Sequence, residues 1–499
     1  MRYEFNKENL GKCLIIFSFF MLIMMIYIAI RYPFLSVDEW FTKGLIKYPV
    51  DQLIQLTIID VHPPLYYLIL KAVTKILTTL HIAYDTVILI TLVSIIPYII
   101  ALILSFTVIR KTYDWLTAGF FAFTLIFMSN FFLQFLTARM YSWGLLFILL
   151  GFLCIRPILK ENNIKYWILL SICAVLGAYT HYFVAIAFVA MYIILFVSQI
   201  LLNKENKKDS IKNWLISVVV GIILYVPWLS ALFGQLSKVH SNYGIPPMTS
   251  GDIIGYFNIL FTTSDYSVLG IIVMIAILIF VLVYYRQYCD NNQESRYLSI
   301  GLITILLTMI IAIVVSLTFK PIIRPRYLVP VSVLLWFAIS VMIPKFDFKK
   351  VVIPILILFL IVGAVNIGEE MGTVYSEHER TVMDLNNLSQ INNNNSIVVF
   401  DGMQKFVRFN DYLNQTDKYY VYSVNGQNHT PKYVKVLDLK KTQFDIPKDI
   451  DKYENKTLYY IVDHKNGIDN AEGYQVNNVT KIQNTMIYSV THSENLIIN

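Results

Sequence analysis

Long apolar runs constrain this chain more than any other feature of its sequence. They cover residues 13–30, 86–109, 115–133, 138–155, 164–180, 183–202, 213–233, 268–286, 297–317, 327–343 and 351–367. About 20 apolar residues cross a hydrocarbon core of about 30 Å as a helix. Strands of a membrane β-barrel alternate in polarity and span only about 10 residues, so a barrel is excluded. The sequence therefore predicts an all-α polytopic membrane protein with about 11 transmembrane helices.

The basic residues indicate how these helices are oriented. With the N-terminus in the cytoplasm, every short inside loop is basic, through Arg110, Lys111, Arg156, Lys160, Lys204, Lys207, Lys208, Lys212, Arg286, Arg296, Lys345, Lys349 and Lys350. This agrees with the excess of lysine and arginine in cytoplasmic loops of membrane proteins. The formal net charge of +7 thus reflects topology next to membrane lipids and indicates no nucleic-acid partner. We expect a multi-pass protein of the plasma membrane.

One further apolar segment, residues 64–80, has the pattern of a surface helix. Its apolar residues recur at helical spacing, and Lys71, Thr74, Lys75 and Thr78 occupy the opposite face. Such a pattern is typical of an amphipathic helix in the membrane interface. Counting it as a span would place all later basic loops outside. We therefore predict an outer juxtamembrane helix within a long outer loop over residues 31–85.

The composition changes at about residue 368, where the chain becomes polar and rich in asparagine. Short strand-like runs follow at Ser396–Phe400, Tyr419–Val424, Tyr433–Leu437, Leu458–Val462 and Met486–Val490. Asn-x-Ser/Thr sequons occur only in this part of the chain, which fits an exterior location. The sequence predicts a transmembrane domain over residues 1–367 and a small extracytoplasmic α/β domain over residues 368–499.

The outer loop carries the residues best suited to chemistry. Asp38 and Glu39 follow the first helix, and a carboxylate there could act as a base toward an acceptor hydroxyl. Asp60 and His62 are two residues apart, so an extended stretch directs both side chains to one side. Such a pair could bind a divalent cation, Mg²⁺ or Mn²⁺. Equally, the pair could be a turn before the surface helix with a histidine in the headgroup layer.

These motifs together resemble a known family. The order is an Asp-Glu pair after helix one, then Asp60-Val61-His62-Pro63-Pro64-Leu65-Tyr66-Tyr67 opening an amphipathic helix. Further matching pieces are Gln134 with Ala138-Arg139-Met140-Tyr141, Tyr179-Thr180-His181-Tyr182-Phe183 and Arg324-Pro325-Arg326-Tyr327. Over residues 10–345 the chain resembles the GT-C glycosyltransferases of the dolichyl-phosphate-mannose protein mannosyltransferase and aminoarabinose transferase type, the family 39-like membrane enzymes.

The resemblance implies roles for particular residues. Asp38 matches the catalytic carboxylate that activates the acceptor hydroxyl, and Glu39 would support it. Asp60 stands where these enzymes place a second acidic residue, which is linked to metal or acceptor binding. Some members have Glu-Lys-Pro-Pro where this chain has Asp-x-His-Pro-Pro. Metal binding and acceptor binding therefore both stay open for Asp60 and His62.

The cations on the predicted outer face indicate a phosphate site independently. Arg139, Lys320, Arg324 and Arg326 lie there against the usual charge bias, with Tyr327 beside the last of them. Arginine binds phosphate bidentately and could stabilise it as it leaves. The alternative is pairing with ordinary anionic headgroups. His181 lies among aromatic residues, which suits either the site or an interfacial aromatic belt.

The function that follows from this interpretation is glycosyl transfer at the outer membrane face. The donor would be a polyprenyl-phosphate sugar, hexose or pentose, and the acceptor a hydroxyl of a protein, lipid or glycan. One-step displacement with Asp38 as the base implies inversion. No cofactor beyond the divalent cation is expected. A transporter or flippase would more often carry charges within its membrane helices, which are nearly free of them here. A structural or sensor protein would leave residues 36–80 without a role.

Overall fold

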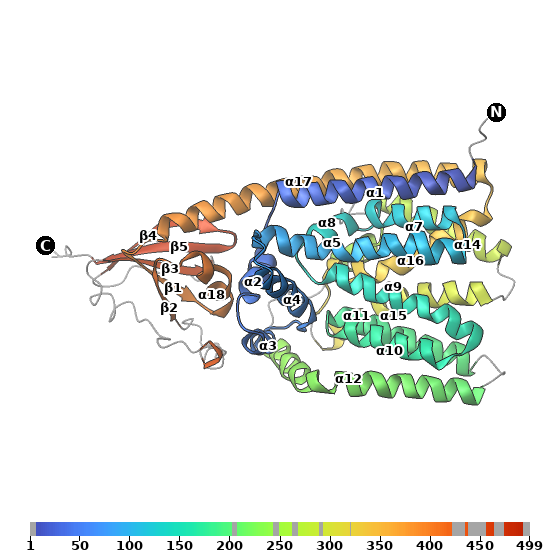
Figure 1. Cartoon of the computed structure of the whole chain (residues 1–499), viewed down its shortest axis with the longest axis horizontal. Helices are drawn as coiled ribbons and strands as arrows, with labels where there is room; N and C mark the ends of the chain where they lie inside the picture. Colours follow the sequence, from blue (N-terminus) through green and yellow to red (C-terminus); the bar gives the residue numbers. More distant parts are fainter. Residues whose placement is uncertain are drawn as a thin grey trace. The chain divides into compact units, whose positions relative to one another are not determined.

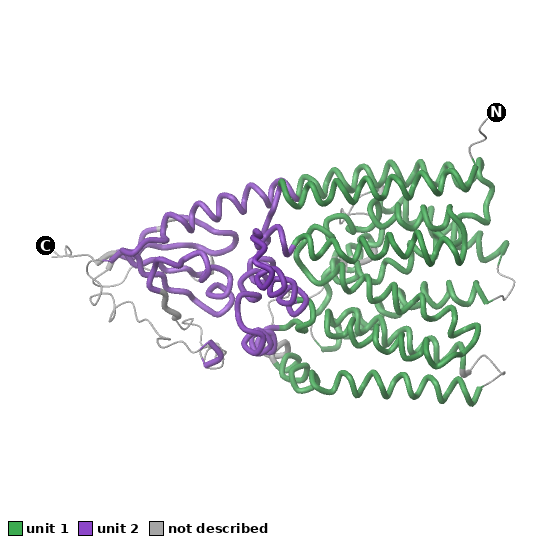
Figure 2. Tube along the Cα trace, viewed as in Figure 1, with its two compact units in different colours: residues 1–31, 61–66, 91–373 green, residues 32–60, 67–90, 374–499 purple. Residues whose placement is uncertain are grey.

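The chain divides into two compact units (Figure 2). The structure is a computed structural model, and it describes residues 6–201, 207–242, 249–261, 268–288, 293–319, 321–421, 435–437, 456–463 and 474–492. The first unit, which we call the helical unit, comprises residues 1–31, 61–66 and 91–373. The second, the loop–sheet unit, comprises residues 32–60, 67–90 and 374–499. The outer loop predicted from the sequence thus groups mainly with the C-terminal region.

Roughly parallel helices build the helical unit (Figure 1). Two of them, α5 and α17, also contribute residues to the loop–sheet unit. The elements are α1 (Lys7–Arg31), α5 (Thr86–Leu104), η1 (Ser105–Ile109), α6 (Arg110–Thr112), α7 (Trp115–Phe127), α8 (Phe131–Leu136), α9 (Tyr141–Glu161), α10 (Ile164–Ala178), α11 (Tyr182–Phe196), η2 (Val197–Leu201), α12 (Lys207–Asn242), α13 (Ser250–Asn258), α14 (Val268–Tyr288), α15 (Gln293–Thr318), η3 (Pro325–Tyr327), α16 (Val329–Met342), η4 (Ile343–Lys345), η5 (Phe348–Val352) and α17 (Ile353–Ile391).

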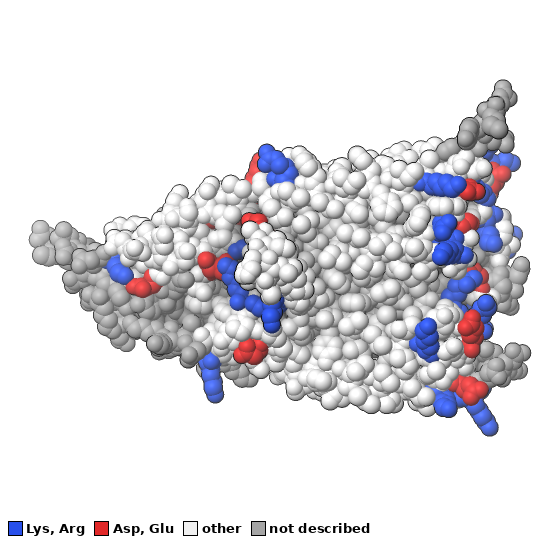
Figure 3. Space-filling model, viewed as in Figure 1, with Lys and Arg blue, Asp and Glu red and all other residues white. Residues whose placement is uncertain are grey.

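The membrane-spanning character predicted from the sequence is confirmed. Among the described residues, 8 helices are long and apolar enough to cross a bilayer. The other three predicted spans coincide with shorter apolar helices, Trp115–Phe127, Ile164–Ala178 and Val329–Lys345. Figure 3 shows a wide belt without charged side chains over the helical unit, as a segment facing lipid requires. The protein is a multi-pass membrane protein.

One predicted span, residues 115–133, is broken in the structure. Helix α7 ends at Phe127, and Ser129 adopts a left-handed φ of 51° before α8 begins. The break is stabilised because residues distant in sequence form hydrogen bonds with the polar groups of Phe127 and Ser129. Asn366 Nδ2 donates to the Phe127 carbonyl at 3.0 Å, and Trp336 Nε1 donates to Ser129 Oγ at 2.7 Å. Non-helical backbone at membrane depth needs such partners within the protein.

Helices α1 and α7 approach each other through two glycines. A Cβ atom on Gly119 would lie 2.2 Å from the Gly11 carbonyl oxygen, and one on Gly11 would lie 2.2 Å from the Trp115 carbonyl oxygen. Neither oxygen can move aside as a flexible side chain would. Small residues that let helix backbones approach closely are a common device of membrane helix packing.

We therefore expect Gly119→Ala to destabilise the protein by about 1–3 kcal/mol, the usual range for overpacking. The matched control is Gly368→Ala on α17, where an added Cβ would meet nothing within 4 Å. Thermal unfolding midpoints of both variants in detergent would test this. A Gly119→Ala protein as stable as the control would contradict the close packing of α1 and α7.

Basic turns gather at one end of the helical unit (Figure 3). Lys7, Arg110 and Lys111 line one cavity of about 420 Å³ at the start of α1 and α7. Lys7 Nζ also donates to the carbonyls of Pro344 and Phe346, which flank Lys345. The gathering of basic turns at this end fits the inside loops predicted from the sequence. Which side of the membrane this end faces stays a prediction.

Three helices form the loop part of the loop–sheet unit. They are α2 (Val37–Leu45), α3 (Val50–Ile59) and α4 (Leu65–Thr79). Helix α4 is the predicted amphipathic helix, and Ile76 within it and Leu80 just after its end remain 56% and 61% exposed, as a lipid-facing surface requires. On its other side, Lys71 Nζ donates to the Ile46 carbonyl at 2.8 Å, next to the end of α2. Neither α2 nor α3 was expected from the hydropathy pattern.

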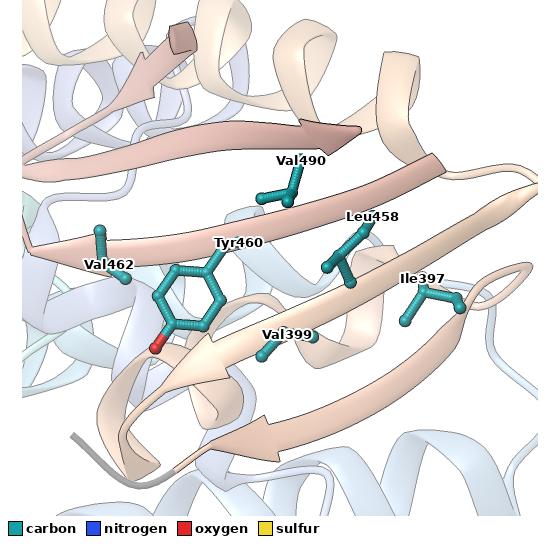
Figure 4. Packing of buried hydrophobic residues seen from close by; sticks show 6 residues of the cluster. All are labelled: Ile397, Val399, Leu458, Tyr460, Val462 and Val490. Atoms are coloured by element: carbon teal, nitrogen blue, oxygen red, sulfur yellow. The ribbon is translucent and has the colours of Figure 1, made fainter. Parts of the chain in front are cut away.

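The C-terminal part of this unit is a mixed five-stranded sheet with the order β2-β1-β3-β5-β4. Its elements are β1 (Ser396–Asp401), α18 (Met403–Phe409), η6 (Asn410–Tyr412), β2 (Asp417–Val421), β3 (Thr457–Asp463), β4 (Tyr474–Ile482) and β5 (Thr485–His492). Strand β1 pairs in parallel with β2 and β3, and β5 pairs antiparallel with β3 and β4. Apolar side chains from β1, β3 and β5 form the core in Figure 4.

Four of the five predicted strands are confirmed, as β1, β2, β3 and β5. The prediction of a strand at Tyr433–Leu437 is wrong for its described residues, because 435–437 form a helical turn. Val436 lines a groove together with Ile58 and Ile59 of α3. Strand β4 was not predicted, since its sequence is polar around Asn477.

Candidate functional site

Six residues of the helical unit, far apart in sequence, form a cluster of cations and rings. They come from the stretch before α4, the turn before α9, the start of α9, the turn between α10 and α11, and η3. We call this the basic–aromatic cluster, and it comprises His62, Arg139, Tyr141, His181, Arg326 and Tyr327. Four of these were predicted as site residues. Arg139, Arg326 and Tyr327 were predicted to bind phosphate, and His181 to belong to the site or to an interfacial aromatic belt. His62 was predicted for a metal or acceptor site, and Tyr141 was only part of a motif.

Arg139 and His62 contact each other directly. Arg139 Nη2 lies 3.2 Å from His62 Nε2, and the Arg139 side chain is only 4% exposed. A guanidinium has donors only, so His62 Nε2 must be the acceptor and the imidazole proton sits on Nδ1. In this arrangement His62 has no free lone pair for a metal ion. Among the described residues, no group of three or more His, Cys, Asp or Glu side chains could hold a metal.

His181 lies at the centre of the aromatic rings. It caps α11 through Nδ1, which accepts from the Phe183 amide at 3.2 Å. Burial, with His62, Arg139 and Arg326 nearby, lowers the pKa of His181 well below the usual range of a histidine. The imidazole is therefore neutral at physiological pH, with its proton on Nε2, and does not compete with an anion for the arginines.

A pH dependence of stability follows from His181. The unfolded chain takes up a proton on this residue between pH 7.5 and pH 5.5, whereas the folded protein does not. The contribution of this residue to stability is thus complete above about pH 7.5 and is lost progressively as the pH falls towards 5.5, because only the unfolded chain gains the proton. The variant His181→Asn keeps an acceptor for the helix cap, and its stability should no longer show this part of the dependence on pH. Unfolding midpoints of both proteins at the two pH values measure it, and equal slopes would contradict it.

Arg326 and two tyrosines complete the cluster. The Arg326 guanidinium lies 6.0 Å from the Tyr141 ring and 5.8 Å from the Tyr327 ring, within the range of cation–π attraction. Tyr327 packs against His181 with ring centroids 4.9 Å apart. Arg326 is exposed, whereas Arg139 is buried. The cluster thus joins a buried and an exposed guanidinium across neutral rings, which suits a bound anion such as a phosphate.

The cluster lies at the opposite end of α9 from the basic turns. Arg139 precedes the first residue of this helix, and Arg156 lies near its last, at Glu161. The 21 residues of α9 extend over about 31 Å, close to the thickness of a hydrocarbon core. The cluster therefore sits where one membrane surface would be, and the basic turns where the other would be.

The remaining predicted cations are less defined. Arg324 is half-buried and immediately precedes η3. Lys320 lies outside the described residues. The motif around His181 is partly structural, because the Tyr179 carbonyl accepts from the Leu65 amide at 3.0 Å. Trp228 Nε1 donates to the Tyr182 hydroxyl at 3.1 Å. These bonds hold the α10–α11 turn against neighbouring segments of the helical unit.

The two adjacent carboxylates of the loop–sheet unit have different surroundings. Glu39 is fully buried, and its Oε2 accepts from the Ser36 amide at 2.8 Å, the reciprocal bond of a capping box. Asp38 is half-buried in the first turn of α2, where the helix N-terminus favours a negative charge. Asp60 ends α3 in an extended conformation and is 7% exposed. Glu39 thus fixes the helix that presents Asp38.

Comparison with known proteins shows the fold. No protein-family model and no curated protein sequence matches the chain. Among solved structures, ArnT from Cupriavidus metallidurans in the apo state superposes with a TM-score of 0.62, at 10% identity over 95% of this chain and 97% of that one. The same protein bound to undecaprenyl phosphate gives a TM-score of 0.61 at 12% identity, over the same shares. The Archaeoglobus fulgidus oligosaccharyltransferase gives 0.49 at 9% identity, over 89% of this chain and 69% of that one. The chain has the GT-C fold that its motifs predicted.

Proposed function

We propose that this protein is a membrane glycosyltransferase that takes a sugar from a polyprenyl-phosphate donor. The observation that supports this best is the basic–aromatic cluster, in which a buried Arg139 and an exposed Arg326 flank neutral rings. The cluster occurs in a chain with the fold of ArnT, of which one structure holds undecaprenyl phosphate. Arg139, Lys320, Arg324, Arg326 and Tyr327 would bind the donor phosphate at the extracytoplasmic face of the plasma membrane.

The chemistry is a single displacement. Asp38 accepts the proton of the acceptor hydroxyl, whose oxygen forms a bond to the anomeric carbon of the donor sugar. The bond from that carbon to the phosphate oxygen breaks, and its electron pair stays on the polyprenyl phosphate. Arg139 stabilises the charge that develops there, so no separate general acid is needed. The configuration inverts, because the acceptor oxygen attacks opposite the leaving phosphate.

Within this mechanism the remaining residues hold the reacting groups in place. Glu39 caps α2 and keeps Asp38 in its first turn. His62 orients Arg139 by accepting from its guanidinium, and His181 supports the rings while staying neutral. Asp60 would bind the acceptor, or a divalent cation together with groups supplied by the substrates. The acceptor is a hydroxyl of a protein, lipid or glycan, and the sugar a hexose or pentose.

The test is donor cleavage by the purified protein in lipid vesicles. Polyprenyl phosphates carrying radiolabelled hexoses or pentoses are supplied with a membrane extract as the source of acceptor, with and without EDTA. We expect one of these donors to be consumed and nucleotide sugars to remain intact. Loss of turnover with EDTA would show that the reaction needs a divalent cation, as a cation-binding role of Asp60 requires. Transfer of intact donor across the bilayer without cleavage would contradict the proposal and favour a transporter or flippase.

A further inference from the structure

We propose that the C-terminal sheet domain positions the helix that carries Asp38, and that Asp411 is the positioning residue through which it does so. The inference depends on the proposed role of Asp38 as the base. All contacts that carry it lie within the loop–sheet unit. They join α2, near the start of the chain, to elements near its end. These elements are η6, α18, α17 and the β4–β5 turn.

The first contact is a buried ion pair. Lys43 Nζ on α2 lies 2.7 Å from Asp411 Oδ2, and the two side chains are only 9% and 8% exposed. Lys47, just beyond the end of α2, pairs with the other oxygen of the same carboxylate. Lys43 also lies 3.9 Å from the centroid of the Tyr412 ring. A buried lysine without its carboxylate would be left uncompensated, so Asp411 fixes where this side of α2 can sit.

The second contact is close packing of backbone and rings. A Cβ atom on Gly44 would lie 1.8 Å from the Val407 carbonyl oxygen, so α2 and α18 touch without an intervening side chain. Trp40 is fully buried, with its ring centroid 5.5 Å from that of Phe409 and 4.9 Å from that of Tyr412. These distances allow α2 little translation or rotation relative to α18.

The third contact holds the segment that leads into α2. The Leu35 amide donates to Thr381 Oγ1 at 2.8 Å, and the Leu35 carbonyl accepts from Gln483 Nε2 at 3.1 Å. Thr381 belongs to α17, and Gln483 to the turn between β4 and β5. Both main-chain polar groups of Leu35, three residues before Asp38, are therefore bound by the C-terminal region. Helix α2 is held at both of its ends.

The consequence for catalysis follows from the length of α2. A helix of nine residues is not stable alone in water, so its position is set by what it packs against. Asp38 and Lys43 are five residues apart, about 7.5 Å along the helix axis. A shift of α2 at Lys43 is thus transmitted to Asp38. Misplacing a catalytic group by about 1 Å can lower the rate about 100-fold.

The experiment compares Asp411→Asn with Asp417→Asn in the full-length protein in lipid. Asp417 is a matched control, because it pairs with Lys456 at 2.7 Å on the surface of the same domain, where it is 53% exposed. For Asp411→Asn we expect a turnover number about 100-fold lower with an unchanged donor KM. We also expect faster hydrogen exchange at residues 36–46, with β1 and β3 as protected as in the wild type. Asp417→Asn should match the wild type, and Asp411→Glu should recover part of the turnover.

Two readouts separate this inference from the proposed function. Hydrogen exchange at residues 36–46 needs no substrate, so it tests the positioning even if Asp38 proves not to be the base. Unchanged exchange in Asp411→Asn, or a raised donor KM at an unchanged turnover number, would overturn the inference. If Asp411→Asn does not fold, Gly44→Ala tests the same contact without removing a charge, because its Cβ meets the Val407 carbonyl. It should lower turnover with the same donor KM, and wild-type turnover would overturn the inference.

Discussion

Asp38→Asn is expected to lower the turnover number by about 10²–10⁴-fold, the usual contribution of a general base. The amide of asparagine has nearly the shape of the carboxylate, but it cannot take up the proton of the acceptor hydroxyl. Asp38 is half-buried in the first turn of α2, so the substitution removes charge without opening a cavity. Turnover with a saturating polyprenyl-phosphate donor measures the effect. The donor KM should change little, since the predicted donor contacts are on the helical unit.

The control for this prediction is Glu39→Gln at the neighbouring position. Glutamine also fits the third position of a capping box, so it can keep the bond to the Ser36 amide. We expect turnover within a few-fold of the wild type. Wild-type turnover by a folded Asp38→Asn protein would remove Asp38 as the base. Equal losses in both variants would mean that the pair acts as a unit and that capping is not the only role of Glu39.

Arg139→Gln is the second substitution expected to have a large effect. It removes a buried guanidinium that would face the leaving phosphate, and removing one preorganised donor of this kind costs about 10²–10³-fold in rate. The kcat/KM for the polyprenyl-phosphate sugar donor should decrease by about this factor. Arg326→Ala should weaken use of the donor more than use of the acceptor, but only several-fold. Arg326 is exposed, and exposed charges interact weakly, by about 1 kcal/mol or less.

The control for Arg139 is Arg156→Gln at the other end of α9. Arg156 Nε donates to Glu294 Oε2 at 3.1 Å and is remote from the basic–aromatic cluster. Its replacement should leave the donor kinetics unchanged. Donor affinity is measured directly by binding of a fluorescent polyprenyl phosphate to the protein in vesicles. If Arg139→Gln binds this lipid as tightly as Arg156→Gln does, the cluster is not the phosphate site.

The spans could be predicted because the length of an apolar run is a local property of the sequence. The break after Phe127 could not, because its partners Asn366 and Trp336 are more than 200 residues away. Helix α2 carried a signal that hydropathy ignores: Ser36 followed by Glu39 is the pattern of a capping box. Strand β4 carried no comparable signal, since its polar residues pair with β5 at the edge of the sheet.

The candidate site was predicted as a set of residue types and not as a geometry. Arg139, His181, Arg326 and Tyr327 were each suggested by motifs and by charges on one face. That His62 faces Arg139 was not foreseen, because an Asp-x-His spacing suits a metal equally well, and the contact spans 77 residues. Asp411 was not foreseen either. Its ion pair with Lys43 joins positions 368 residues apart, a separation that local patterns do not report.

That separation has a consequence during synthesis of the chain. Lys43 emerges from the ribosome 368 residues before Asp411, which at about 5–20 residues per second is a delay of about 20–70 s. Throughout this interval Lys43 lacks the carboxylate of Asp411, and Trp40 lacks the rings of Phe409 and Tyr412. The loop–sheet unit can close only after the last membrane helix has been inserted. If the ribosome stalls before residue 400, we therefore expect a membrane-inserted chain that is sensitive to protease and inactive. The ability to catalyse the reaction is thus acquired in the last step of biogenesis.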